Sequence, residues 1–126
     1  MRDNARVLMT VPDGDLAALL MSPAHLTQTW PGSEREVMML LHILRMAEPS
    51  VRDALAVGLV AMIPVGTDTN SSLIGLTHRS AALTAMALNR KTKEPVTAPH
   101  TRPEEVTMLE LHDVAVDGRS AIRKIG

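Results

Sequence analysis

The chain has 126 residues, a length that suits one domain with a real hydrophobic core. It contains no cysteine and has a net charge of −1, which excludes disulfides, thiolate catalysis, zinc–sulfur sites and a global basic field for nucleic acid. Trp30 is the only aromatic residue among Phe, Trp and Tyr, which argues against a stacking platform for single-stranded nucleic acid or carbohydrate. Because no N-terminal apolar run is long enough for a signal peptide, we expect a cytoplasmic location.

The N-terminal part of the chain contains short segments. We expect residues 1–6 to be a flexible polar terminus. Val7 to Val11 is a short apolar run that can form a strand or a tether. A Pro-Asp-Gly turn sequence ends it. Either Asp13 or Asp15 can cap a short helix over residues 16–21.

The next segment has the pattern of a strongly apolar helix over residues 33–48. Ser33 and Glu36 form a capping-box pattern at its start. Leucine, isoleucine, valine and methionine fill most of the later positions, and Pro49 ends the helix because proline lacks the backbone N–H. We expect Trp30 to pack on the start of this helix, with a partner-binding hot spot as the alternative.

A second apolar helix is predicted over residues 50–63. Ser50 is its expected cap, with Asp53 in the first turn. No charged residue follows until Asp68, and Gly58 lies at the middle of the apolar run. Since glycine lowers helix propensity, we interpret Gly58 as a position that another backbone approaches closely.

These two helices are apolar around most of their circumference, which leaves two interpretations. The pair forms the core of the monomer, or part of its surface binds a second copy or another protein. Membrane insertion is disfavoured because the run is shorter than the roughly 20 residues that span a bilayer. The residues expected to contact a partner are Trp30, Leu40, Leu44, Leu55, Leu59 and Met62.

The second half of the chain divides into three parts. Residues 72–90 have apolar positions at helical spacing and predict a long third helix. Residues 91–103 contain prolines among polar residues and predict an exposed linker. Residues 106–125 are rich in β-branched residues around Asp117-Gly118, which favours a C-terminal β-hairpin over a helix.

The predicted fold is therefore mainly α, with one domain over residues 1–126. It is a compact helical domain of about four helices, built on an antiparallel pair (residues 33–48 and 50–63) with a third helix over residues 72–90. A β-hairpin over residues 106–125 completes it.

No motif for catalysis or metal binding is present. None of the five histidines forms a His-Glu-x-x-His pattern, and we predict no catalytic, metal or cofactor site. His112 with Asp113 is compatible with an oriented base, yet no nucleophile has an activating context. A small enzyme or ligand-binding protein built around His42 or His112 is therefore only the third hypothesis, and it requires a pocket with a second polar group within reach.

The segment from Ser33 to Ile63 resembles one known structural element. Its acidic start, apolar helix, Glu-Pro-Ser break and second apolar helix are similar to the helix pair that follows the DNA-reading domain in some bacterial repressors. The similarity covers about a quarter of the chain, and the remainder has no helix-turn-helix pattern.

We therefore predict a small, non-enzymatic cytoplasmic protein that interacts or regulates through a hydrophobic helical surface, as a homodimer or with a protein partner. Nine methionines are compatible with an adaptable contact surface, but we interpret them first as core filler in place of the missing phenylalanine. The alternative is a DNA-binding transcriptional regulator, which would need its basic residues to converge on one face. Those residues are Arg79, Arg90, Lys91, Lys93, Arg119, Arg123 and Lys124.

Overall fold

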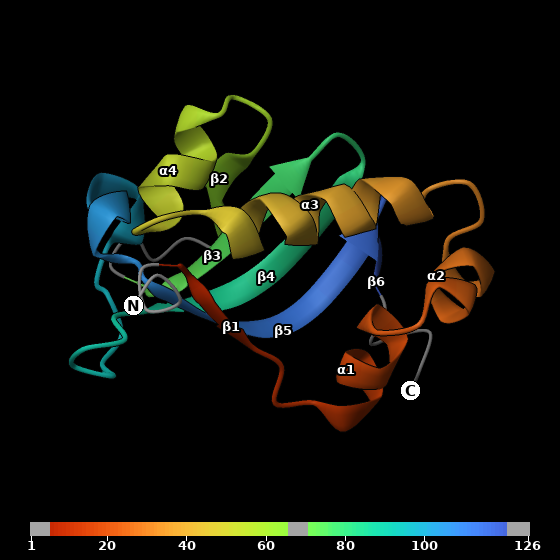
Figure 1. Cartoon of the computed structure of the whole chain (residues 1–126), viewed down its shortest axis with the longest axis horizontal. Helices are drawn as coiled ribbons and strands as arrows, with labels where there is room; N and C mark the ends of the chain where they lie inside the picture. The colour runs from red at the N-terminus through yellow and green to blue at the C-terminus, as the bar shows by residue number, and fades with distance from the viewer. Residues whose placement is uncertain (1–5, 66–70, 121–126) are drawn as a thin grey trace.

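A β-sheet with helices on one face organises the chain (Figure 1). The computed structural model describes residues 6–65 and 71–120. The strands are β1 (Leu8–Thr10), β2 (Ala61–Pro64), β3 (Leu73–His78), β4 (Ala81–Leu88), β5 (Met108–Val116) and β6 (Arg119–Ser120). The helices are α1 (Gly14–Leu20), α2 (Pro23–Thr29), α3 (Glu34–Met46) and α4 (Val51–Ala56), with the 3₁₀ turns η2 (Pro99–Thr101) and η3 (Pro103–Glu105).

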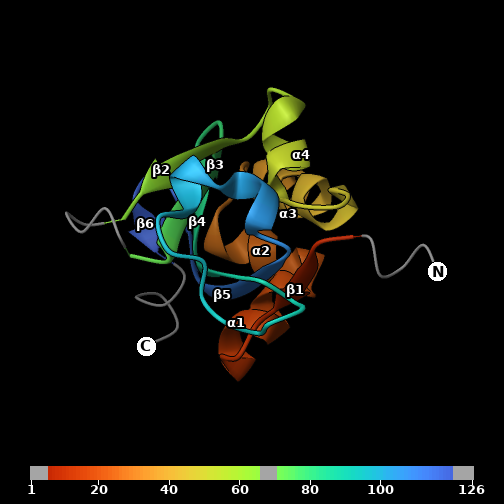
Figure 2. The same ribbon diagram turned by 90° about the vertical axis from the view of Figure 1, so that its left-hand side faces the viewer.

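The sheet is mixed and has the strand order β1-β5-β4-β3-β2. β1 runs parallel to β5, the other neighbours are antiparallel, and β6 pairs with the end of β5. Figure 2 shows α3 and α4 on one side of the strands. The prediction of a mainly α fold is therefore wrong: the chain is an α/β protein with one layer of helices on a sheet.

The predicted helix over residues 72–90 is in fact the β3–β4 hairpin. Its residues alternate between the two faces, so that Ile74, Leu76, Leu83 and Ala85 are buried towards α3. Alanine is a strong helix former, but packing on a sheet overrides this propensity. The sequence did not predict the β3–β4 turn, because Arg79 occupies a position with φ 54° where glycine or asparagine is usual.

The predicted helix over residues 50–63 ends early, at Ala56. Its cap is as expected at Ser50, whose backbone N–H donates to Asp53 Oδ2 at 3.1 Å. Gly58 has φ 86° and stops the helix, and a Cβ added there would meet no other described atom within 4 Å. Gly58 therefore marks a helix end, not a close backbone approach, and the apolar residues after it enter β2.

Two other local predictions are confirmed. Asp13 caps α1, since its carboxylate accepts a hydrogen bond from the backbone N–H of Leu16 at 3.0 Å. The C-terminal hairpin forms as far as residue 120, where the described residues end, with Asp117 (φ 51°) and Gly118 (φ 81°) in its two-residue turn.

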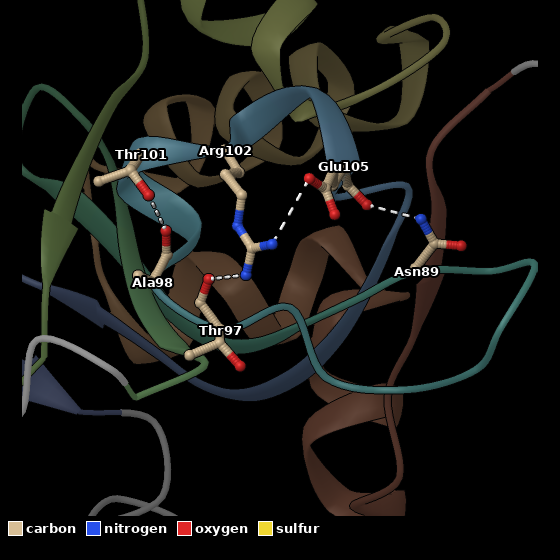
Figure 3. A network of polar contacts seen from close by, with 6 residues as sticks. All are labelled: Asn89, Thr97, Ala98, Thr101, Arg102 and Glu105. Atoms are coloured by element: carbon tan, nitrogen blue, oxygen red, sulfur yellow. Dashed lines mark hydrogen bonds and ion pairs between the residues drawn. The ribbon is translucent and has the colours of Figure 1, made fainter.

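The segment predicted as an exposed linker is folded against the sheet (Figure 3). Most of its side chains are exposed, but Val96 and Pro99 are buried. Arg102 donates through Nη2 to the carbonyl of Thr97 at 2.6 Å, and the side chain of Asn89 donates to the carbonyl of Glu105 at 3.1 Å. The backbone N–H of Val51 donates to the carbonyl of residue 106, which places α4 beside η3.

A single core lies between the sheet and the helices. Trp30 is fully buried in it, as are the residues of α3 that face the sheet. The inward residues of β5 complete the core beneath α3. The one tryptophan thus joins the α2–α3 connection to the core and does not lie on the surface.

Candidate protein-interaction surface

The sheet covers one face of helix α3 and leaves the opposite face exposed. Val37, Leu40, Leu41 and Leu44 point towards the sheet and are buried. The opposite side, which we call the outer face of α3, is exposed to solvent. It consists of Arg35, Met38, Met39, His42, Arg45 and Met46.

Most of the large exposed apolar side chains of the described residues lie on or beside this face. Met38, Met39 and Met46 have 46%, 45% and 47% of their surface accessible. Val57 and Leu59, from the loop after α4, are also more than half exposed and flank it. Burying such side chains is favourable by about 25 cal/mol per Å² of apolar surface. A cluster of large exposed apolar side chains is typical of a contact site.

Two hollows lie on either side of the α3 ridge. The hollow between α3 and the α1–α2 corner has a volume of about 590 Å³ and is lined by Met21, Met38 and Arg45. The hollow between α3 and α4 has a volume of about 440 Å³ and is lined by Met46 and Glu48. His42 lines both hollows and so occupies the crest between them.

The rotation of α3 about its axis is fixed by a contact with the β3–β4 turn. Glu36 Oε2 accepts hydrogen bonds from the backbone N–H of Ser80 at 2.9 Å and from its hydroxyl at 2.6 Å. The expected capping box is therefore absent: Ser33 starts the helix without a side-chain hydrogen bond, and Glu36 stabilises a distant turn instead.

The same contact lowers the pKa of Glu36 below its usual range. The hydroxyl of Ser80 makes the largest contribution and its backbone N–H the next, while desolvation opposes them. Arg79 and His78 add weaker attraction. The carboxylate is therefore ionised and occupied, which leaves Arg35 and Arg79 as the accessible charges around a third hollow of about 270 Å³.

His78 positions the loop beside that third hollow. Its ring is buried, and Nδ1 lies 2.9 Å from the carbonyl oxygen of Leu59. Leu59 itself is exposed and lines the hollow with Met39. The histidine thus anchors the backbone that presents Leu59 at the surface.

The six predicted contact residues are divided between core and surface. Trp30, Leu40 and Leu44 are buried within the chain, and Leu55 and Met62 are partly buried against the core. Leu59 is exposed beside the outer face of α3. The excess of apolar residues in 33–63 identified this segment from the sequence. It did not identify the exposed methionines Met38, Met39 and Met46.

Among the described residues, the basic side chains predicted to contact nucleic acid do not converge on one face. Arg79 lies in the β3–β4 turn, and Arg119 starts β6 beside that turn, where the Asp117 N–H donates to the Ser80 carbonyl. Arg90, Lys91 and Lys93 follow the other end of β4, roughly 25 Å away for a strand of this length. Arg123 and Lys124 lie outside the described residues.

The two histidines of the third hypothesis both lie at the surface. His112 is exposed, and its Nε2 lies 2.9 Å from Glu110 Oε1. His42 is exposed on the α3 crest, where the described residues offer it no hydrogen-bond partner. Within residues 6–65 and 71–120, no three His, Asp or Glu side chains are grouped to hold a metal ion.

None of the helices in the described ranges is long and apolar enough to cross a membrane. The fold and the surface thus define an α/β domain with a methionine-rich outer helix face. No protein-family model matches the chain. No curated protein and no solved structure matches it either.

Proposed function

We propose that this chain is a non-enzymatic protein-interaction module that acts through the outer face of α3. The observation that carries the proposal is the exposure of Met38, Met39 and Met46 on one side of a helix whose other side is fully packed. Methionine is flexible and polarisable, so such a face adapts to the shape of a partner at low cost.

The contacts that hold the outer face of α3 and the loop of Leu59 in place also favour this role. Residues that position the face are themselves held by specific contacts: Glu36 binds Ser80, and His78 binds the Leu59 carbonyl. A partner would therefore meet a preorganised surface and would lose little free energy in ordering it. The hollows beside α3 provide recesses for side chains of the partner.

The test introduces charge into the face without touching the core. Met38→Glu and Met46→Glu are compared with Leu8→Glu, a control at a position that is also about 40% exposed but lies on β1. Each purified variant captures proteins from an extract of the native host, including an untagged copy of itself, and mass spectrometry quantifies what is retained.

We expect both methionine variants to lose the same retained proteins by tenfold or more, while the Leu8→Glu control keeps them. Circular dichroism and Trp30 fluorescence establish that all three variants are folded. Retention that does not differ between the methionine variants and the control would contradict the proposal.

A further inference from the structure

The outer face of α3 has a centre, and it is His42. At 3.6 residues per turn, its six residues span an arc of about 120°, with His42 at the middle of that arc. Along the axis, Met38 and Met46 lie four residues before and after His42, about 6 Å in each direction. The face is therefore arranged almost symmetrically about one exposed side chain.

The charges around this face differ between its two ends. At the N-terminal end of α3, Arg35 and Arg79 line the third hollow, where the only carboxylate is the occupied Glu36. At the C-terminal end, Glu48 lines the hollow between α3 and α4 and forms no hydrogen bond or ion pair with any other described residue. The third hollow is thus basic and the hollow between α3 and α4 is acidic, while Arg45 lies on the other side of the face.

From this pattern, and resting on the proposed function, we infer that the partner is a second copy of the chain, bound antiparallel through α3 with His42 on the two-fold axis. In that arrangement Met39 of one copy lies opposite Met46 of the second copy. Arg35 is then brought near Glu48 of the second copy, and symmetry makes the ion pair twice.

The remaining charge on the face is compatible with this pairing. Arg45 lines the hollow on the α2 side and lies opposite Met38 of the second copy. Its aliphatic stem packs on apolar surface while the guanidinium stays in water. A parallel arrangement would instead place the basic end against the basic end, which is unfavourable.

The absence of cysteine makes the axis directly testable. His42→Cys puts two thiols at the centre of the contact, where the Cα atoms of antiparallel helices come within the roughly 7 Å that a disulfide permits. The matched control is His112→Cys, the same substitution at an exposed position on β5. Both variants, at about 50 μM, are oxidised mildly and their covalent dimers measured.

We expect His42→Cys to form a covalent dimer at least tenfold faster than His112→Cys. Sedimentation of the unmodified chain is expected to show a dimer whose population rises with micromolar concentration. Arg35→Glu and Glu48→Arg should each weaken the dimer by about tenfold, and the double variant should recover most of the loss, because the pair is restored with reversed sign.

A chain that stays monomeric at 200 μM would overturn the inference, and so would faster cross-linking at residue 112 or no recovery in the double variant. These failures are separate from failure of the proposed function. If the chain is monomeric but capture from extract still depends on Met38 and Met46, the surface binds a different protein and only the inference about a second copy falls.

Discussion

The two faces of α3 are expected to respond oppositely to truncation. Leu44 is 0% exposed and packs in the core, whereas Met38 is 46% exposed on the outer face. Leu44→Ala leaves a cavity under α3 and costs about 2–5 kcal/mol of the free energy of unfolding. Met38→Ala removes side-chain atoms that are largely in water, so we expect a cost of less than about 1 kcal/mol.

These free energies translate into a measurable difference in melting temperature. For 126 residues, an unfolding entropy of about 2.1 cal/mol/K per residue gives about 0.26 kcal/mol/K for the chain. A loss of about 3 kcal/mol in Leu44→Ala therefore lowers the Tm by about 11 °C, and the loss in Met38→Ala lowers it by less than about 4 °C.

The assay is thermal unfolding followed by tryptophan fluorescence, since buried Trp30 is the only tryptophan of the chain. Far-UV circular dichroism on the same samples checks that secondary and tertiary structure are lost together. Association is measured in parallel, where Met38→Ala should weaken self-association or partner binding and a folded Leu44→Ala should not. Equal Tm losses in the two variants would refute the assignment of the inner and outer faces.

Two further predictions concern contacts between elements. In Ser80→Ala the pKa of Glu36 should rise towards its usual value, which a carboxyl NMR titration measures. A carboxylate whose pKa is lowered in the folded state stabilises the fold above its usual pKa, and this stabilisation is lost as the pH falls through the folded-state pKa. The stability of this variant should therefore fall less with decreasing pH than that of the unmodified chain. In Gly75→Ala the added Cβ would lie 2.7 Å from Ile63 Cγ1. We therefore expect the free energy of unfolding, measured by denaturant titration, to fall by about 1–3 kcal/mol, and we expect Ile63→Ala to relieve most of this loss. If the effects of the two substitutions simply add, the contact is refuted.

The local signals in the sequence identified part of the fold. Asp13 before α1 and Asp117-Gly118 in the C-terminal turn are residues whose chemistry favours a single local structure, and both predictions are confirmed. The prediction for residues 72–90 was wrong because alanine-rich strands have the composition of a helix. In addition, the carboxylate that accepts hydrogen bonds from the turn belongs to Glu36, which is 44 residues away from Ser80 in sequence. A long-range carboxylate cannot be recognised as a turn signal in one sequence.

The candidate site shows a similar limit. The apolar excess of residues 33–63 pointed to the right segment for exposed apolar surface, yet it could not say which side of α3 faces the sheet. The sequence contained one signal for the orientation of α3, namely the position of its arginines around the helix. Arg35 and Arg45 lie on the same side of the helix as the three exposed methionines. The side that carries Val37, Leu40, Leu41 and Leu44 has no charged residue. Arginine on one arc and leucine on the other is typical of an outer and an inner face.

The pairing of β1 with β5 has a consequence for how the chain is made. The backbone N–H of Leu8 donates to the carbonyl of Thr107, and the guanidinium of Arg90 donates to the carbonyl of Arg6 at 2.8 Å. β1 therefore has no partner in the sheet until β5 has been synthesised, since Leu8 pairs with Met108. Helices α1 to α4 can form earlier, but β1 can join the sheet only after β5 has been made. Nascent chains that stop before β5 would leave β1 open to aggregation or degradation.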